Sequence, residues 1–585
     1  MYHLPESTMR HYRAMGVYQD QTFVHLLERL CQEHAGREAL VDAANRADFF
    51  GGAPRRLSYA QVWAEVRSMA AMLLDHGLRQ DDILCVQLPN TNELVMTYFA
   101  CAMIGVVITP APMQYREHEL GHILQHTNAR AIMSFARTGK NSELVRCEQL
   151  AQAQGVAAGT APIVMAWYPE AASHAEALQQ TTGRSHIPLT PGCASAEQLE
   201  ALDVYCGDHA VDADATFTLC WTSGTEGLPK GVPRSHNQWM IAARTIVEAV
   251  QLQPGARLLN TFPLTNPGSL SGMVVPWLLT GGALVQHQPF DLEVFLDQIR
   301  DERIDYTCAS PALLATLLQN EALTTGIDWA RLRRIASGSA PLSEWLVRGY
   351  AERFGVEIVN CYGSSEGAAL YSCALDVPDH GQRAHFFPRL GAQGFDWSLS
   401  IGGLIETRLV DPDSGNVVRE PGQQGELRVK GPNVFGGYYN APELNAAAFD
   451  ADGFYRTGDT FEIAGDRSQF YKFVGRTKDI VIRGGFNISA AEIEGLIQAH
   501  PQVREVAIVG QPDPRLGERV CAVVVPAQDA SLDLPQLIAY LRDEVGIAAY
   551  KLPERLVLVD SLPRNPMGKV IKQQLRASIS KEMTT

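Results

Sequence analysis

The stretch that decides the fold reads Thr222-Ser223-Gly224-Thr225-Glu226-Gly227-Leu228-Pro229-Lys230-Gly231. It follows an apolar run at 217–221 that is typical of a buried strand. Glycines let main-chain N–H groups approach phosphate oxygens, and Lys230 adds a compact positive charge. The same residue types also make ordinary turns, and the composition alone favours a turn.

This stretch is not the phosphate loop of P-loop kinases and GTPases. Their Walker A pattern needs Gly-x4-Gly-Lys-Ser/Thr, whereas Gly227 is followed here by Leu-Pro-Lys-Gly. Other motifs in the chain must therefore test the prediction of a phosphate site.

The composition is that of a globular protein with more than one domain. A chain of 585 residues is too long for one compact core, and its 46% hydrophobic and 19% charged residues are ordinary for globular proteins. The net charge of −16 argues against a general nucleic-acid or anionic-membrane surface, so we expect no nucleic-acid partner.

Cysteine usage and the chain start indicate a cytoplasmic protein. The eleven cysteines form no C-x-x-C pattern, which is typical of reduced thiols and argues against a zinc site. The first seven residues contain no apolar signal core. The uncharged run at 94–113 is long enough to span a bilayer, but Gly105, Pro110 and Pro112 divide it. We therefore expect a buried helix and a short strand there, and no integral membrane segment.

The order of the elements predicts an α/β fold. From Leu57 onward, helical segments alternate with short β-branched strands, which favours helix-covered sheets in a large N-terminal domain. Residues from about 137 to 210 are less regular, and we interpret them as a surface excursion. Short strands and glycine-containing turns after Phe395 predict a β-rich subdomain. The segment 475–585 is nearly neutral, unlike the acidic part before it, and is predicted to be a small C-terminal domain.

Further motifs occur in a fixed order along the chain. They read Ser-Gly-Ser-Ala-Pro-Leu at 337–342, Tyr-Gly-Ser-Ser-Glu at 362–366, Tyr-Arg-Thr-Gly-Asp at 455–459, Gly-Arg-Thr-Lys-Asp at 475–479 and Pro-Arg-Asn-Pro-Met-Gly-Lys at 563–569. Together with the first stretch, they resemble the AMP-forming acyl-adenylating superfamily, which includes acyl-CoA synthetases, aryl-acid AMP ligases, peptide-synthetase adenylation domains and luciferases. The resemblance covers residues from about 57 to 572.

The resemblance implies which residues hold ATP and Mg²⁺. Tyr362 would stack on adenine, and Asp459 would accept hydrogen bonds from the ribose hydroxyls. Glu366 would bind Mg²⁺ with Thr225, since a carboxylate oxygen is a suitable hard ligand. The implied ATP-binding residues are Thr222, Ser223, Gly224, Thr225, Gly227, Lys230, Gly338, Ser339, Ala340, Tyr362, Gly363, Ser365, Asp459, Arg476 and Lys569.

Three residues are implied to be catalytic, namely Lys230, Glu366 and Lys569. Lys569 would bridge the acyl carboxylate and the α-phosphate, and so stabilise charge that develops as the bond forms. No protein nucleophile is needed, so catalysis would consist of positioning and charge neutralisation.

The resemblance also implies a domain rotation. It divides the chain into an adenylation domain at 1–474, a hinge at 475–478 with Lys478 as its pivot, and a mobile α+β domain at 479–585 that carries Lys569. After adenylation, the rotation would remove Lys569 and bring Gly484, Gly485 and Phe486 to face CoA.

The implied acyl pocket is lined by His236, Asn266, Pro267, Gly268 and Ser337. The family commonly has a histidine near the place of Asn266, and its loss among small residues predicts room for a medium-chain or cyclic carboxylate. Ser337 in a glycine-rich motif would narrow the floor of the pocket. The residues of these motifs are most similar to those of ligases for short or medium fatty acids and cyclohexane-type carboxylates.

The expected function is ATP-dependent activation of such an acid, through an acyl-adenylate, to an acyl-CoA thioester. ATP, Mg²⁺ and CoA are the expected cofactors, the partners are small molecules, and a homodimer is compatible with the resemblance. A stand-alone aryl-acid AMP ligase that loads a carrier protein would share every ATP residue. A nucleotide-binding protein without catalysis should have lost Lys569, which is present.

Overall fold

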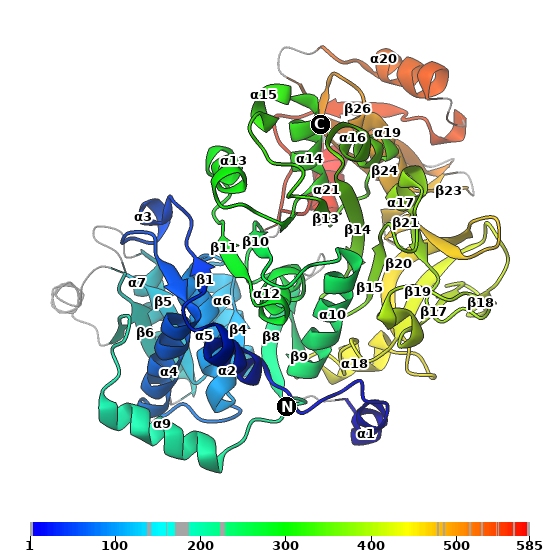
Figure 1. The fold of residues 1–585 in the computed structure, drawn as a ribbon. Coiled ribbons are helices and arrows are strands. Elements are labelled where there is room, and N and C mark those ends of the chain that lie inside the picture. Colours follow the sequence, from blue (N-terminus) through cyan, green and yellow to red (C-terminus); the bar gives the residue numbers. More distant parts are fainter. Residues whose placement is uncertain are drawn as a thin grey trace.

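The structure is a computed structural model of the chain (Figure 1). It describes residues 4–136, 142–158, 161–169, 186–222, 229–476, 479–483, 486–513, 516–527, 531–545, 547, 549–565 and 568–581.

One sheet of seven strands carries the stretch at 222–231. In spatial order its strands are β7 (Ile187–Leu189), β6 (Ile163–Trp167), β5 (Ala131–Phe135), β3 (Ile83–Val86), β4 (Val107–Pro110), β8 (Thr216–Thr222) and β9 (Lys230–Ser235). Neighbouring strands are parallel as far as β8, and β8 and β9 form an antiparallel hairpin in which Thr222 pairs with Lys230. The hairpin therefore brings the two ends of the stretch together.

The second sheet has eight strands. Their spatial order is β15 (Ala369–Ser372), β14 (Glu357–Gly363), β13 (Arg334–Gly338), β12 (Tyr306–Cys308), β10 (Arg257–Asn260), β11 (Ala283–Gln286), β1 (Glu38–Val41) and β2 (Arg56–Ser58). Only the outermost pair at each edge is antiparallel. The motifs at 337–342 and 362–366 begin at the carboxyl ends of β13 and β14, where α/β folds place ligands.

The β-rich subdomain predicted after Phe395 is present as a six-stranded antiparallel sheet. Its strands, in spatial order, are β16 (Phe386–Pro388), β21 (Phe470–Arg476), β20 (Tyr455–Ala464), β19 (Gln424–Lys430), β17 (Glu406–Val410) and β18 (Val417–Val418). One cluster of buried side chains includes residues from all three sheets described so far, for example Ile108, Leu258 and Leu427. The three sheets therefore share a core.

Helices pack between and around these sheets (Figure 1). Trp277 of α12 (Val275–Thr280) stacks on Tyr59 of α4 (Tyr59–Asp75), with ring centroids 5.8 Å apart, and meets Phe99 of α5 (Asn92–Ile104) edge-on at 5.9 Å. The remaining helices of this part are α1 (Glu6–Ala14), α2 (Phe23–His34), α3 (Arg46–Phe49), α6 (Glu117–Thr127), α7 (Ser142–Ala158), α9 (Ala196–Asp208), α10 (His236–Ala249), α11 (Pro267–Ser269), η1 (Leu270–Val274), α13 (Leu292–Asp301), α14 (Pro311–Gln319), α15 (Glu321–Thr324), α16 (Glu344–Phe354), α17 (His380–His385), η2 (Ser400–Gly403) and α18 (Pro442–Ala448).

The uncharged run at 94–113 forms a buried helix, as predicted. Every residue of α5 is buried, and the helix ends at Gly105, whose φ of 74° is left-handed and suits glycine. The strand that follows continues through Pro110 rather than stopping before it. No helix in the described part of the chain is both long and apolar enough to cross a membrane.

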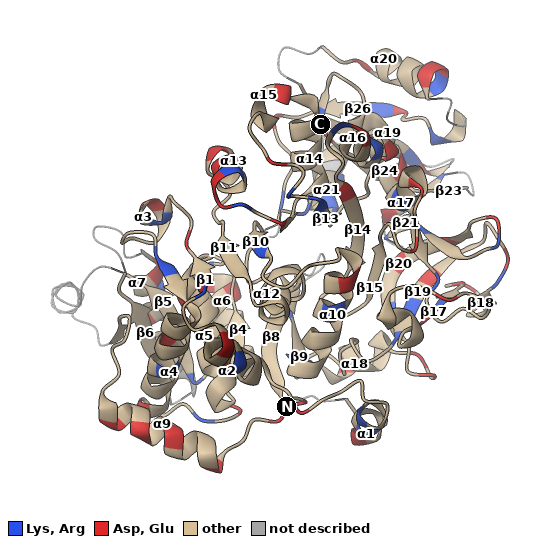
Figure 2. Ribbon diagram, in the orientation of Figure 1, with Lys and Arg blue, Asp and Glu red and all other residues tan. Residues whose placement is uncertain are grey.

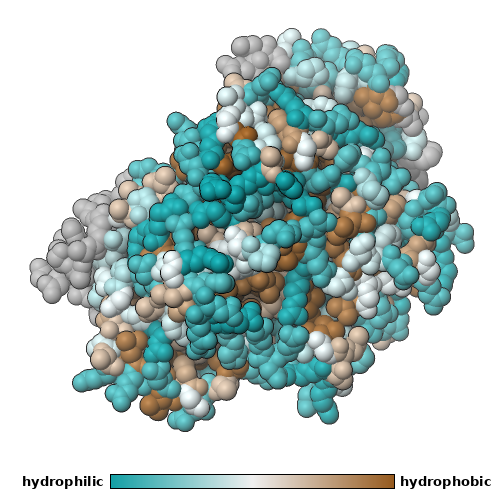
Figure 3. All heavy atoms as spheres, in the orientation of Figure 1, coloured by the Kyte–Doolittle hydropathy of each residue, from teal (hydrophilic) through white to brown (hydrophobic). Residues whose placement is uncertain are grey.

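The interpretation of residues 137–210 as a surface excursion was wrong in part. Strands β6 and β7 lie in this segment and extend the seven-stranded sheet in parallel beyond β5. The helices α7 and α9 also belong to it, and α9 carries only acidic charges (Figure 2). Most of the face seen in Figure 3 is hydrophilic, with small apolar areas between.

A buried ionic cluster joins the start of α3 to the start of α5. The guanidinium of Arg46 is 1% exposed and donates from Nη1 to Asp42 Oδ2 at 2.6 Å. It also binds both carboxylate oxygens of Glu93, at 2.7 and 2.8 Å. Burial and the negative charge of Glu93 raise the pKa of Asp42. Arg46 therefore neutralises two carboxylates that have no access to water.

The C-terminal part forms a separate five-stranded sheet. It contains β22 (Val481–Arg483), β23 (Phe486–Ile488), β24 (Val503–Asp513), β25 (Gly517–Pro526) and β26 (Arg555–Leu558), with the helical segments α19 (Ala490–Gln498), α20 (Leu534–Ala539), η4 (Tyr540–Glu544), η5 (Ala549–Lys551) and α21 (Lys572–Lys581). Its buried side chains form clusters of their own. A separate core supports the predicted boundary near 475–478, which stays a prediction.

Candidate active site

The hairpin of β8 and β9 carries the two ends of the predicted phosphate-binding stretch at 222–231, which are the parts of it that the structure describes. Lys230 opens β9, and its ammonium lies 5.2 Å from the centroid of the Tyr438 ring. On the other side, His122 of α6 lies with Nε2 3.2 Å from the carbonyl oxygen of Pro229. Ser223, Gly224, Thr225 and Gly227, with the metal role predicted for Thr225, lie outside the described residues.

The motif at 337–342 follows β13 closely beside β14. A Cβ atom on Gly338 would lie 2.3 Å from the carbonyl oxygen of Cys361, so only glycine fits there. Ser337 is buried and donates its hydroxyl to the carbonyl oxygen of Ala309 at 2.8 Å. Because this hydroxyl is engaged with main chain, no contact of Ser337 supports the predicted narrowing of an acyl pocket. Ser339 and Ala340 are exposed.

Ser339 has a left-handed backbone, with φ of 71°. This conformation strains a residue that has a Cβ atom. We expect Ser339→Gly to stabilise the protein by up to about 1 kcal/mol, measured as the shift of the urea unfolding midpoint. The control is Ser343→Gly. Ser343 has an ordinary φ of −91° and its hydroxyl caps α16, so its replacement should destabilise by a few tenths of a kcal/mol. Equal effects at both positions would contradict backbone strain at Ser339.

Tyr362, Asp459 and Arg476 come together from three strands. The Tyr362 hydroxyl donates to Asp459 Oδ2 at 2.6 Å, and Arg476 Nε lies 3.5 Å from Asp459 Oδ1. Asp459 and Arg476 face each other because β20 and β21 pair at these positions. Burial raises the pKa of Asp459, while Arg476 and the Tyr362 hydroxyl oppose the rise. The carboxylate thus has a cation and a hydroxyl already oriented toward it.

Glu366 lies at the end of the motif that starts with Tyr362. Its side chain is mostly buried, and Oε1 accepts a hydrogen bond from the Tyr438 hydroxyl at 2.8 Å. Within the described residues, Oε2 has no hydrogen-bond partner. A carboxylate with one uncommitted oxygen fits a hard divalent cation such as Mg²⁺. Between Tyr362 and Glu366 lie Gly363, which ends β14, and Ser365, which belongs to the loop that follows.

Lys569 comes from the C-terminal domain to the same place. Its main chain is fixed by Asn565, whose side chain accepts from Lys569 N at 2.9 Å and whose N–H donates to Lys569 O at 2.8 Å. The residue keeps exposed surface, yet the surrounding protein and the charge of Arg476 lower the pKa of its ammonium, while Asp459 and Glu366 oppose the shift. Two cations and two carboxylates therefore lie within electrostatic reach of one another.

The residues expected at the acyl pocket lie on three elements, since Ser337 belongs to β13 and the others to α10 and to α11 with its cap. His236 starts α10 and is 1% exposed, stacked on Phe217 and edge-on to Phe23, with both centroids at 4.8 Å. Burial lowers its pKa to about 3, so the ring is neutral at pH 7. Asn266 caps the short helix α11 that contains Pro267 and Gly268, with Oδ1 2.9 Å from Gly268 N.

The remaining predicted residues are only partly described. Lys478, Gly484 and Gly485 lie outside the described residues, and of Phe486 only the main chain is placed, paired with Arg483 between β23 and β22. The loop at 431–438, by contrast, was not predicted to serve the site. It supplies Tyr438, and its glycines and aromatic residues were the available signal.

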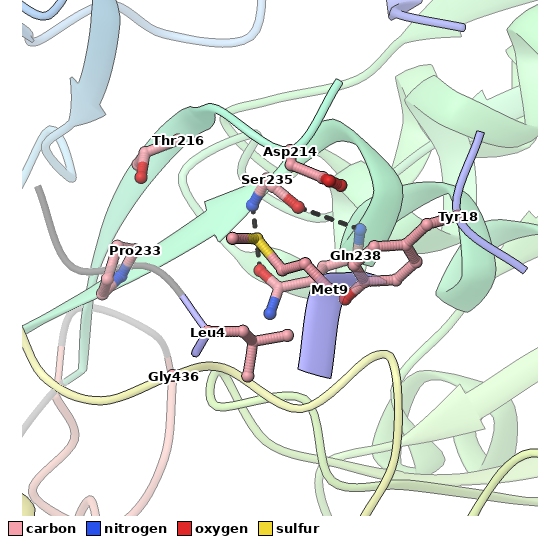
Figure 4. A pocket seen from close by; sticks show the side chains of 9 residues that line it. All are labelled: Leu4, Met9, Tyr18, Asp214, Thr216, Pro233, Ser235, Gln238 and Gly436. Atoms are coloured by element: carbon pink, nitrogen blue, oxygen red, sulfur yellow. Dashed lines mark hydrogen bonds between the residues drawn. The ribbon is translucent and has the colours of Figure 1, made fainter. Parts of the chain in front are cut away.

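The cavity shown in Figure 4 is not a substrate site. Its lining comes from the N-terminal arm, the hairpin with the residues just before it, α10 and the loop at 431–438, and consists of Leu4, Met9, Tyr18, Asp214, Thr216, Pro233, Ser235, Gln238 and Gly436. Its volume is about 10 Å³, which is room for about one water molecule. Ser235 and Gln238 close its wall by exchanging the two hydrogen bonds of a capping box.

Comparison with known proteins fixes the family. The model of the AMP-binding enzyme family matches residues 27–439, and that of the AMP-binding enzyme C-terminal domain matches residues 492–569. The chain belongs to the AMP-binding enzymes. This confirms the predicted membership in the AMP-forming acyl-adenylating superfamily, whose members activate an acid as its adenylate.

Relatives of this AMP-binding enzyme carry different names. It is 32% identical to pyochelin synthase PchD of Pseudomonas aeruginosa strain UCBPP-PA14, over 99% of this chain and 96% of that protein. It is equally 32% identical to indoleacetate–CoA ligase of Aromatoleum aromaticum, over 90% of this chain and 94% of that protein. Relatives thus include a synthase as well as a CoA ligase, so family membership does not fix the acceptor.

A solved structure confirms the predicted fold class. The ATP-bound structure of MatB from Rhodopseudomonas palustris is 26% identical to this chain and superimposes with a TM-score of 0.71, covering 95% of this chain and 99% of that one. A large domain of sheets and helices followed by a small C-terminal domain is therefore the architecture of this AMP-binding enzyme.

Proposed function

We propose that this enzyme converts a medium-chain or cyclic carboxylic acid into its CoA thioester, with release of AMP and pyrophosphate. The observation that carries the proposal is the meeting of Lys569, Arg476, Asp459 and Glu366. Two of these residues come from the β-rich sheet, one from the carboxyl end of a parallel strand and one from the C-terminal domain. Such a set suits a reaction that needs positioning and charge neutralisation rather than a protein nucleophile.

Each residue of this set has a distinct proposed role. Asp459 accepts hydrogen bonds from the ribose hydroxyls, for which a carboxylate with two acceptor oxygens is suited. Arg476 and Lys230 neutralise phosphate charge. Lys569 lies between the acid and the α-phosphate, and its positive charge favours the transition state of adenylation.

A magnesium ion fits the uncommitted oxygen of Glu366. When bound, the ion would screen the negative charge of the phosphates. The Tyr438 hydroxyl holds the other oxygen of Glu366 and so orients the carboxylate toward one side. Thr225 is proposed as the second ligand from the family pattern.

The acid would lie near His236, which is proposed to line the acyl pocket with Asn266. The His236 ring is neutral, buried and packed against two phenylalanines, so its place in the wall of the acyl pocket is proposed from the family pattern. CoA is favoured as acceptor because two relatives are named CoA ligases, one of them medium-chain fatty-acid–CoA ligase of Escherichia coli at 28% identity, and a third is named feruloyl-CoA synthase. Rotation about Lys478 would then bring Gly484, Gly485 and Phe486 to the thiol.

The test is pyrophosphate release with Mg·ATP and a panel of aliphatic, alicyclic and aromatic acids, each with and without CoA. Sustained turnover that needs CoA and selects medium-chain or cyclic acids is the expected result. A single burst of about one equivalent with an aromatic acid, followed by turnover only when a phosphopantetheinyl carrier protein is added, would replace the proposal by the carrier-loading alternative.

The pH dependence of adenylation reports on Lys569. The protonated ammonium is the useful form, and its lowered pKa means that the proton is lost at a lower pH than from an ordinary lysine. We expect acid-dependent pyrophosphate release to fall on the alkaline side with a midpoint below about 10.4. Lys569→Arg keeps its charge at high pH, so any residual activity of this variant should lack that decline. An identical alkaline decline in both proteins would contradict the assignment.

A further inference from the structure

Arg234 is a buried cation without a buried anion beside it. It lies on β9, four residues after Lys230, and is 2% exposed. It forms no ion pair with a described carboxylate, and its Nε atom has no hydrogen-bond partner. Burying a cation in this way is costly. A merely structural position could hold an apolar side chain at less cost, so the charge needs another explanation.

The contacts of Arg234 point to the loop that carries Glu366. Its Nη1 donates to the carbonyl oxygen of Ser365 at 3.1 Å, and its Nη2 donates to that of Gln238 at 3.3 Å. The ring of Trp239 lies against the guanidinium, 4.4 Å from its carbon, and fixes its plane. The guanidinium therefore binds one carbonyl oxygen of the loop that carries Glu366 and one of α10.

Three successive carbonyl groups of that loop are held from outside it. Ser365 O accepts from Arg234, Glu366 O accepts from the N–H of Phe435 at 2.8 Å, and Gly367 O accepts from the side chain of Asn433 at 2.7 Å. A Cβ atom on Gly367 would lie 1.9 Å from Asn433 O, so the two loops touch. The side chains of Ser365 and Glu366 have few alternative directions once these carbonyls are fixed.

We propose that Arg234 is a positioning residue for adenylation, which fixes the main chain at Ser365 and so helps to hold the neighbouring Glu366 in place. The inference rests on the proposed role of Glu366 at the phosphates. Arg234 touches neither ATP nor the acid in this account. It acts through the Ser365 carbonyl.

The test compares Arg234→Met with Arg234→Lys. Methionine removes the charge and the hydrogen bonds, whereas lysine keeps the charge and loses the planar fork. We expect Arg234→Met to lower kcat of acid-dependent pyrophosphate release by about 10- to 100-fold and to raise the Mg²⁺ concentration for half-maximal activity. The KM for the acid should change little. Arg234→Lys should keep part of the activity. An unchanged kcat and Mg²⁺ requirement in folded Arg234→Met would overturn the proposal.

The matched control is Arg244→Met. Arg244 lies on α10, ten residues further along, and donates to the side chain of Gln19 away from the loop. This variant should leave both kcat and the Mg²⁺ requirement unchanged. If kcat fell equally in Arg244→Met and Arg234→Met, the effect of Arg234→Met would be general destabilisation, and the positioning role would be overturned.

Hydrogen exchange separates this inference from the proposed function. Amide exchange at 363–367 should be faster in both Arg234 variants than in the wild type, and unchanged in Arg244→Met. Wild-type protein that releases no pyrophosphate with any acid would refute the proposed function, while faster exchange at this loop would still support the anchoring by Arg234. Unchanged exchange in a folded Arg234→Met protein would refute the anchoring itself.

Discussion

Replacing Lys569 with alanine should lower acid-dependent pyrophosphate release by about 100- to 1,000-fold, which is the usual loss when a preorganised electrostatic donor is removed. Lys569 is the cation that the C-terminal domain adds to Arg476, Asp459 and Glu366. Nucleotide binding should stay within a few-fold of the wild type, because Asp459, Arg476 and Tyr362 remain. The measurements are initial rates of pyrophosphate release and the dissociation constant of a non-hydrolysable ATP analogue.

A neighbouring lysine provides the control for this variant. Lys572 lies three residues further along, and its ammonium pairs with Glu494 at 2.7 Å. Lys572→Ala removes a cation from the same domain without touching the proposed site, so its adenylation rate should be close to that of the wild type. Supplied with a synthetic acyl-adenylate and CoA, Lys569→Ala should still form the thioester. Undiminished pyrophosphate release by Lys569→Ala would refute the role of this residue.

Replacing Arg46 with methionine should destabilise the N-terminal domain by about 3–5 kcal/mol, because it strands two buried carboxylates. Asp42 and Glu93 both bind this guanidinium at 2.6–2.8 Å and neither is accessible to water, while the second cation near Glu93, Arg55, lies further away at 3.5 Å. In the variant, proton uptake by Asp42 would remove part of the cost of burying an unpaired carboxylate. The decrease in the free energy of unfolding should therefore be smaller at pH 5 than at pH 8. Urea unfolding followed by tryptophan fluorescence measures it, using the transition that includes this domain.

Arg56 is the matched control for Arg46. It also binds two carboxylates, those of Glu38 and Glu302, but its side chain is 51% exposed. Arg56→Met should cost less than about 1 kcal/mol, since water replaces the lost partner. A loss below about 1 kcal/mol for Arg46→Met as well would show that the buried carboxylates are solvated or protonated without cost, contrary to this account.

The family resemblance predicted one nucleotide site from motifs that lie far apart in the sequence. The structure brings Tyr362 and Asp459 into contact and places Lys569 within electrostatic reach of Asp459 and Glu366, while the roles of these residues stay a prediction. Strands β6 and β7 were missed because each is a short apolar run within a sequence rich in alanine and glutamine, which does not predict strands. Their place in the sheet depends on pairing with β5, which no local pattern encodes.

The contributions of Arg234 and Tyr438 could not be predicted for a different reason. Arg234 lies between a proline and a serine in the sequence, and arginine is usually a surface residue. Only the structure shows that its side chain is buried and bound to the carbonyl oxygen of Ser365. Tyr438 lies far along the chain from Glu366, whose carboxylate it binds. The glycines and aromatic residues at 431–438 marked this loop, but no periodicity or spacing in the sequence indicated that Tyr438 binds Glu366.

The position of β1 in the second sheet governs the order in which the newly made chain can fold. This strand, at residues 38–41, lies between β11 and β2, and it pairs in parallel with residues 284 and 285. During synthesis, residues 38–41 must therefore wait for the strand at 283–286 to leave the ribosome before that pairing can form. The first sheet can assemble earlier from its contiguous segments, while β1, even when paired with β2, keeps its other edge unpaired and available to chaperones.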